Sequence, residues 1–145
     1  MRKMGRLFCY LVLSTIIAGC SVTPPTIMRD PEVGVVSTSG IGDVMYVYTK
    51  TPQVFVDDMN AKATNQTDGL QQVIVYSGLA KSELKILYRE YVNDFARASF
   101  FQDATYEYSP PGSTKIKFKG AELEVLDATN TEIKYKVISG FTGEE

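Results

Sequence analysis

The chain has 145 residues, of which 44% are hydrophobic and 22% charged, and its formal net charge is −2. This length is typical of one ordinary domain, and the composition excludes the disordered and collagen-like classes. Because the sequence contains no histidine, Ser-His and Cys-His nucleophilic catalysis and zinc sites built on imidazole are excluded. No basic stretch is interleaved with aromatic residues, which argues against a nucleic-acid partner.

Residues 1–19 have the pattern of a secretory signal peptide. Three basic residues lie within the first six positions, an apolar run covers 7–17, and the small residues Ala18 and Gly19 follow. A run of about 11 residues is too short to cross ~30 Å of hydrocarbon as a helix. We therefore expect a leader that is removed.

The end of this leader, Ile17-Ala18-Gly19-Cys20, resembles the lipobox of bacterial lipoproteins. The resemblance implies cleavage between Gly19 and Cys20 by a signal peptidase of type II, with acyl chains such as palmitate on Cys20. Each buried methylene contributes about 0.8 kcal/mol, so more than one chain anchors the protein durably. Ser21 stands where Asp commonly signals retention in the inner membrane, which implies the periplasmic face of the outer membrane. An ordinary leader with a free thiol at Cys20, or a buried apolar helix, is the alternative.

Cleavage before Cys20 changes what the mature domain can do. Cys9 is removed with the leader and Cys20 carries lipid, so no thiol remains for a disulfide, a redox pair or a metal. Three basic residues are also lost, which changes the balance from 15 basic against 17 acidic residues to 12 against 17. The mature domain is therefore acidic, and its contact with a membrane depends on the lipid.

Residues 20–32 are predicted to carry the lipid and to form a tether. Positions 21–31 hold three prolines and show no hydrophobic period. Such a segment favours polyproline-like geometry at ~3.1 Å per residue, and so reaches up to ~30 Å. In the alternative, residues 26–28 dock on the domain as an edge strand.

Residues 33–145 are predicted to form a single, mainly β domain, a small antiparallel sandwich or barrel. Short strands separated by turn signals are expected at 33–37, 43–49, 53–56, 72–76 and 104–108. Turns are expected at 39–42 and at Ser77-Gly78. Residues 57–69 are polar and are expected to form a surface loop. They lack the ligand spacing of an EF-hand, which argues against a calcium site.

The segment 82–98 fits two structures. Its apolar residues fall on one helical face behind Ser82, a plausible N-cap, and a strand template fails at Glu90. Its content of Tyr, Ile, Val and Phe, and the strands expected on both sides, favour a bent strand that continues a hairpin from 72–76. Strand is our prediction, with one helix at 82–98 as the alternative.

Residues 115–137 predict a three-stranded meander, because apolar and charged residues alternate with period two. A two-residue loop at Gly120-Ala121 would place Lys117 opposite Glu124, although a bulge there is an alternative. A three-residue loop at 128–130, with Asn130 in the left-handed region, would place Glu124 opposite Lys134. Both registers pair opposite charges on a solvated face.

Two tyrosine pairs are candidate binding residues. Tyr46 and Tyr48, and likewise Tyr106 and Tyr108, place two rings on one face of a predicted strand. A glycan- or peptide-binding platform uses this arrangement, and core packing explains it as well. Arg89-Glu90 and Asp94-Arg97 place opposite charges among aromatic residues and are read as structural charge pairs. The sequence assigns no catalytic residue, no metal ligand and no cofactor.

These observations favour a non-catalytic binding or scaffolding module that is anchored in the bacterial outer membrane. Its expected partners are the membrane, through the lipid, and an envelope protein or peptidoglycan. The alternative is an inhibitor of, or a carboxylate-dependent hydrolase acting on, cell-wall polymers.

Overall fold

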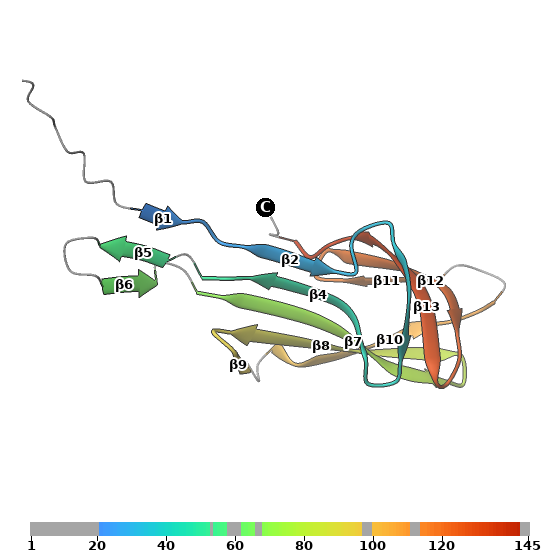
Figure 1. Ribbon diagram of the computed structural model, residues 1–145. Helices are drawn as coiled ribbons and strands as arrows, with labels where there is room; N and C mark the ends of the chain where they lie inside the picture. The colour runs from blue at the N-terminus through green and yellow to red at the C-terminus, as the bar shows by residue number, and fades with distance from the viewer. Residues whose placement is uncertain are drawn as a thin grey trace, which may run out of the picture.

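The computed structural model describes residues 21–52, 54–57, 62–65, 68–96, 100–110 and 114–142. Within them the chain is mainly β, as predicted. Two antiparallel sheets pack on each other without closing into a barrel, as in a small β-sandwich, and a third, smaller sheet lies at one end (Figure 1). Each strand predicted between residues 33 and 108 overlaps an observed strand.

The larger of the two packed sheets has the order β10-β8-β7-β4-β2, with the short β9 on β8. Its strands are β2 (Ile27–Asp30), β4 (Val44–Lys50), β7 (Leu70–Ala80), β8 (Glu83–Val92), β9 (Phe95–Ala96) and β10 (Gln102–Glu107). The second sheet has the order β11-β12-β13-β3. Its strands are β3 (Val36–Gly40), β11 (Thr114–Phe118), β12 (Ala121–Ala128) and β13 (Glu132–Ser139).

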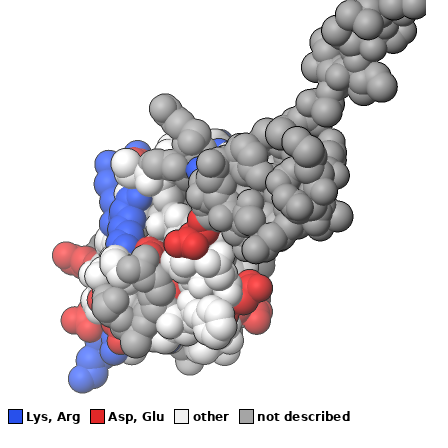
Figure 2. All heavy atoms as spheres, turned by 90° about the vertical axis from the view of Figure 1, so that its left-hand side faces the viewer, with Lys and Arg blue, Asp and Glu red and all other residues white. Residues whose placement is uncertain are grey.

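The small sheet extends the body at the end where β4 leaves it and β7 enters it (Figure 1). It consists of β1 (Ser21–Thr23), β5 (Val54–Asp57) and β6 (Lys62–Asn65), in the order β1-β5-β6. Part of the loop predicted over 57–69 is therefore strand β6, and the rest of its tip lies outside the described residues. Seen from this end, the described surface carries basic and acidic side chains (Figure 2).

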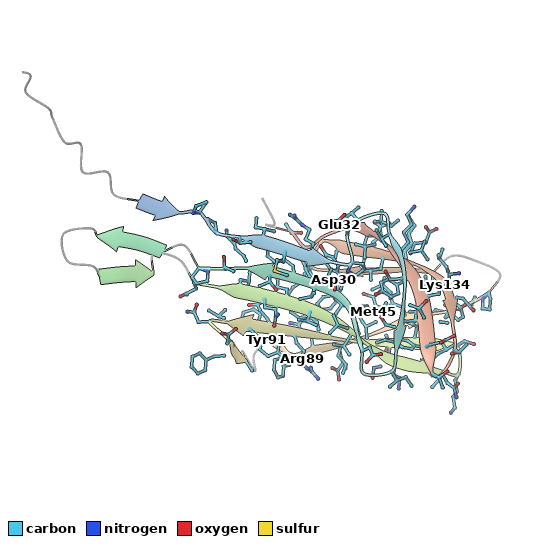
Figure 3. The ribbon with its side chains drawn as sticks, in the orientation of Figure 1. Asp30, Glu32, Met45, Arg89, Tyr91 and Lys134 are labelled. Carbon is cyan, nitrogen blue, oxygen red and sulfur yellow. The ribbon has the colours of Figure 1, made fainter. Side chains whose placement is uncertain are left out.

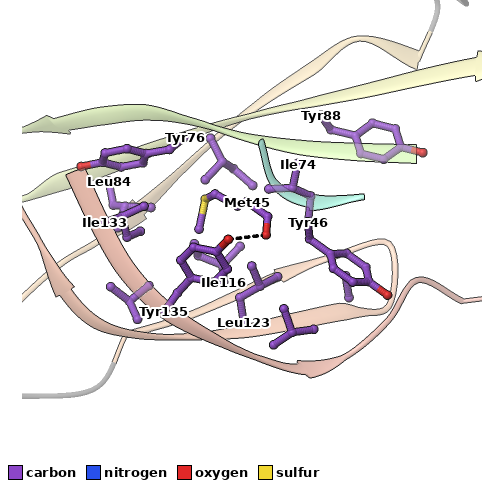
Figure 4. Close-up of a cluster of buried hydrophobic side chains, with 14 of the residues drawn as sticks. Met45, Tyr46, Ile74, Tyr76, Leu84, Tyr88, Ile116, Leu123, Ile133 and Tyr135 are labelled. Carbon is purple, nitrogen blue, oxygen red and sulfur yellow. Dashed lines mark hydrogen bonds between the residues drawn. The ribbon is translucent and has the colours of Figure 1, made fainter. Parts of the chain in front are cut away.

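The hydrophobic core lies between the two packed sheets, because alternate residues of each strand point toward the other sheet. Five tyrosines are among the largest side chains that are fully buried there, and the Tyr135 hydroxyl donates to the Met45 carbonyl at 2.5 Å (Figure 4). Phe141 closes one end of this core, with its ring centroid 5.3 Å from that of Tyr46. The core residues that Figure 4 labels are Met45, Tyr46, Ile74, Tyr76, Leu84, Tyr88, Ile116, Leu123, Ile133 and Tyr135.

The strand prediction for 82–98 is confirmed over β8 and β9, and the alternative helix there is wrong. Leu84, Ile86 and Tyr88 are buried at alternate positions, and Glu90 continues the same face. Pairing with β7 along its length outweighs the helical pattern. The turn predicted at Ser77-Gly78 is also wrong: Gly78 lies at a bulge within β7, and the hairpin turns at 81–82, where both residues have positive φ.

The C-terminal meander is confirmed, but its first turn lies one residue earlier than predicted. The loop is Lys119-Gly120, with φ of 46° and 89°, which fits a turn that needs positive φ at both central positions. Pairing therefore shifts by two residues, and Lys117 lies opposite Glu122. A shift of two preserves which face each side chain occupies, so charges still oppose charges.

The second turn also differs from the prediction. Asn130 is not among the residues with positive φ; instead the Thr129 hydroxyl accepts from the backbone nitrogens of Thr131 and Glu132. A register shift between Val125 and 127 follows, and Glu124 lies opposite Lys136 rather than Lys134. Side-chain capping of the turn thus replaces the left-handed asparagine.

The N-terminal segment follows the alternative that the sequence left open. Residues Ile27–Asp30 pair antiparallel with β4 as an edge strand, and Ser21–Thr23 pair with β5. The polyproline-like geometry predicted for 21–31 therefore does not describe these two strands. Backbone pairing with a neighbouring strand accounts for the difference, since it satisfies groups that a free tether leaves to water.

Candidate functional site

An open groove of about 860 Å³ lies between β3 and the face of the larger sheet that points away from the core. In Figure 1, β3 runs beside the bent start of β4 and crosses in front of β7, with β13 on its other side. One wall is therefore the edge of β3, through Ser37, Thr38 and Ser39, and the floor comes from β4, β7 and β8. The floor residues of these strands alternate with core residues, and Tyr135 of the core also lines the groove.

The floor is organised by the register of four strands. Asp30 lies opposite Val47, Val47 opposite Val73, and Val73 opposite Arg89. These four residues form one row across β2, β4, β7 and β8, which we call the charged-end row. With strands ~4.8 Å apart, its two ends are separated by about 14 Å. The row thus has an acid at one end, a base at the other, and two valines between them.

The neighbouring row makes the floor more apolar. Val44 lies opposite Val75, and Val75 opposite Leu87, again across β4, β7 and β8. Val73 is only 7% exposed, whereas Val44 is 47% exposed. Further exposed aliphatic residues lie in β3 and in the segments beside it, namely Val33, Val35, Val36 and Ile41. Such a concentration of exposed apolar side chains is typical of interaction surfaces.

The charged ends of the row lie at opposite sides of the sheet face (Figure 3). The Arg89 guanidinium lies over the Phe101 ring, 4.6 Å from its centroid, and Tyr91 lies beside the same ring. Among the described residues no carboxylate pairs with Arg89, and no lysine or arginine pairs with Asp30. Both groups are therefore available to a ligand.

Buried hydrogen bonds fix the β3 wall. The Ser39 hydroxyl donates to the Val44 carbonyl at 2.9 Å and lies 3.1 Å from the Tyr135 hydroxyl. Tyr135 in turn donates to Met45, and burial raises the pKa of its phenol. Since β3 and β4 belong to different sheets, these bonds hold the corner that shapes the groove.

A second polar cluster lies inside the core around Glu90, which is 6% exposed. The Tyr88 hydroxyl donates to the Glu90 carboxylate at 2.7 Å and accepts from the Gln72 amide at 2.8 Å. Burial, followed by the hydrogen bond to Glu90, raises the pKa of Tyr88. Tyr88 therefore stays protonated and remains a donor.

Lys119 completes this cluster. Its ammonium lies 3.4 Å from the Glu90 carboxylate, 4.4 Å from the centroid of Tyr88 and 4.7 Å from that of Phe100. The carboxylate thus has a charged partner and a hydrogen-bond donor, as a buried acid requires. This arrangement joins β8 to the turn between β11 and β12, and we assign it a structural role.

The structure places three of the four predicted binding tyrosines in the core. Tyr46, Tyr48 and Tyr108 are at most 6% exposed, so their rings form no exposed platform. Tyr106 is partly buried against the core, and its hydroxyl donates to the Lys117 carbonyl at 2.6 Å. These tyrosines therefore follow the other interpretation of the pairs, which is packing in or against the core.

The remaining predicted sites fall partly outside the described residues. Gly19 and Cys20 lie there, and so does Arg97, while Asp94 is exposed in the turn after β8. Within the described ranges, no cluster of three or more His, Cys, Asp or Glu side chains could hold a metal ion. In the same part of the chain, no helix has the length and apolar character needed to span a bilayer.

Sequence reasoning missed the groove. It read Glu90 as a structural pair with Arg89, but these neighbours occupy opposite faces of β8 and Glu90 pairs with Lys119. The groove depends on which strands neighbour each other, and no local pattern contains that information. Glu90 did leave a signal, because it interrupts the strand pattern of 82–98 at a position that continues the buried face. Comparisons of the chain with protein-family models, with curated proteins and with solved structures give no match.

Proposed function

We propose that this protein is a lipoprotein of the bacterial outer membrane that acts as a non-catalytic binding or scaffolding module in the cell envelope. The lipobox-like sequence that ends at Cys20 supports the anchor. The observation that carries the binding role is the groove, whose apolar floor runs between Asp30 and Arg89. A floor of this kind suits recognition of a partner, because apolar contact supplies affinity and the charges supply orientation.

The Glu90 cluster gives no support to the hydrolase alternative. A hydrolase of cell-wall polymers requires an acid and a base or nucleophile at an open cleft. Glu90, the most buried carboxylate in the described residues, is held by Tyr88 and Lys119 inside the core. A role in holding the sheets together explains it.

Fractionation of cells that produce the full chain tests the anchor. The protein should sediment with outer membranes, and Cys20→Ser should release it into the soluble periplasmic fraction. Mass spectrometry of the mature N-terminus should find acyl chains on Cys20. An unmodified thiol, or unchanged sedimentation of the variant, would contradict the proposal. Cys9→Ser is the matched control, because it alters the other cysteine within the leader.

Crosslinking in intact cells tests the binding role. A photoreactive amino acid at Thr38, on the groove wall, should give adducts with an envelope component. The same group at Lys115, which is exposed on β11 at the opposite edge of the second sheet, should give few. Equal labelling from both positions would contradict a role for the groove.

A further inference from the structure

We propose that the groove receives an extended polypeptide segment of a partner protein, which pairs with the edge of β3 and lies over the charged-end row. This inference rests on the proposed binding role and names what the module binds. Three features of the described residues carry it: the edge of β3, the apolar floor, and the charges at the two ends of the row.

The first feature is the position of β3 at the end of its sheet. It pairs with β13 on one side, and within the described part of the chain no strand pairs with its other side. Ser37, Thr38 and Ser39 of β3 line the groove. At the end of β3, the Gly40 N–H is bonded to the Asp43 carboxylate. A strand edge presents backbone N–H and C=O groups in the spacing that another extended chain needs. A segment bound there would extend the four-stranded sheet by one strand.

The second feature is the direction of the floor relative to this edge. β3 crosses in front of the larger sheet at β7 (Figure 1), so a chain alongside β3 also crosses the strands of that sheet. The charged-end row crosses them too, from Asp30 to Arg89. An extended chain rises ~3.4 Å per residue, so about four residues cover the ~14 Å row. Alternate side chains of that segment would face Val47 and Val73.

The third feature is the separation of the two charges. Asp30 and Arg89 are too far apart to neutralise each other, and neither has an ion-pair partner among the described residues. The Phe101 ring holds the Arg89 guanidinium by its face, which leaves the donors at its edge for a carboxylate. The complementary segment carries an acidic residue at the Arg89 end and a basic residue at the Asp30 end, with apolar residues between. A neutral glycan lacks this pair of charges.

Defined peptides test the proposal with the full chain in detergent. Two labelled probes have capped ends and the same composition, alternating valine and threonine, with lysine and glutamate about four positions apart in opposite orders. We expect one order to bind about tenfold more tightly in fluorescence anisotropy, because two partly exposed ion pairs together contribute roughly that factor. The double variant Asp30→Lys, Arg89→Glu should prefer the opposite order by a similar factor.

The matched control exchanges a charge pair elsewhere. Lys115→Glu with Glu122→Lys reverses an exposed ion pair on β11 and β12, away from β3, and likewise exchanges one acidic and one basic residue. This variant should keep the original preference. Circular dichroism of all variants shows whether each is folded.

Backbone methylation tests strand addition itself. Methyl groups on alternate peptide nitrogens along one edge of the probe should weaken binding at least about tenfold, since they remove the donors to β3. Methyl groups along the other edge should leave it unchanged. If both edges tolerate methylation, the segment does not add to the sheet, and this part of the proposal is wrong.

Other outcomes overturn the proposal as a whole. They are no binding of either probe up to about 1 mM, no preference between the orders, or a preference that the charge exchange does not invert. Competition by a soluble peptidoglycan fragment but not by the probes would assign the groove to glycan. Self-association that depends on Arg89 would assign it to a second copy. None of these results affects the test of the anchor at Cys20, so the two proposals fail separately.

Discussion

Glu90 and Lys119 are 29 positions apart in the sequence, and in the folded protein a carboxylate oxygen of one lies 3.4 Å from the ammonium nitrogen of the other. Glu90 belongs to β8 in the larger sheet, whereas Lys119 lies in the turn between β11 and β12 in the second sheet. The pair therefore joins the two sheets across the core, beneath the ring of Tyr88.

Loss of the cation should destabilise the protein. Lys119→Met keeps the aliphatic stem but leaves the Glu90 carboxylate buried without its charged partner. We expect the free energy of unfolding to fall by about 2 kcal/mol, less than for a fully buried pair because the Lys119 side chain is 31% exposed. Urea unfolding followed by circular dichroism measures this. Lys117→Met, which removes a surface ion pair, should change it by less than about 1 kcal/mol.

A double variant tests whether the destabilisation comes from the buried charge. Glu90→Gln removes that charge and keeps a partner for Tyr88. Combined with Lys119→Met, it should lose less stability than the sum of the single variants, because an amide is less costly to bury than a carboxylate. Strict additivity would show that the two groups act independently.

The exposed ion pairs of Lys115 and Lys117 with Glu122 predict that stability depends on pH. Hydrogen bonds from Lys115 and then Lys117 lower the pKa of this carboxyl below its ordinary value of 4.5. A lowered folded pKa stabilises the protein above the unfolded value, and this contribution is lost as the pH falls through the folded pKa. Wild type should therefore exceed Glu122→Gln in urea midpoint at pH 6, and the gap should close below about pH 4.5. A gap independent of pH would contradict the assignment.

Gly120 should tolerate no side chain. Its φ is +89°, and a Cβ there would collide with Thr142 Oγ1 and lie 2.5 Å from the Thr142 nitrogen. We expect Gly120→Ala to lower the free energy of unfolding by roughly 2–4 kcal/mol, from strain together with displacement of the C-terminal segment. Gly42→Ala is the matched control, since its φ is +85° and no atom lies within 4 Å of its Cβ. It should show the backbone strain alone, about 1 kcal/mol, and equal losses would contradict the packing argument.

The hydrogen bonds behind the groove wall should contribute measurably to stability. Tyr135→Phe removes the donor to the Met45 carbonyl and a neighbour of the Ser39 hydroxyl. We expect the free energy of unfolding to fall by about 1–2 kcal/mol, because a buried acceptor is left without its donor. Tyr106→Phe, whose hydroxyl bonds to Lys117 near the surface, should have a smaller effect. A larger loss of stability for Tyr106→Phe would argue against a stabilising role of the hydrogen bonds between β3, β4 and Tyr135.

The C-terminal meander shows which structural features can be predicted from the sequence and which cannot. Alternation of charged and apolar residues predicts which residues of 115–137 face the core, because the side-chain period of a strand is two. It does not distinguish registers two residues apart, since both place charge opposite charge. That choice was made by the backbone of Lys119 and Gly120, both with positive φ, and by the Thr129 hydroxyl.

Glu90 shows why long-range partners limit the prediction. A carboxylate at a buried strand position breaks the alternation of apolar and polar residues that predicts a strand. Only its partners in the folded protein explain why it can be buried there. The partners come from β7, from β8 itself and from a turn in the other sheet. The same limit applies to the groove, because Asp30 and Arg89 share a row only through the order of four strands.

The pairing of β1 with β5 has a mechanical consequence for a lipid at Cys20. Ser21 already lies opposite Val56, and Ile27–Asp30 lie on β4. An acylated Cys20 would therefore be joined to paired strands rather than to a flexible linker. The domain would then keep a nearly constant height and tilt above the bilayer. A partner in the same membrane would meet the groove in one orientation rather than in many.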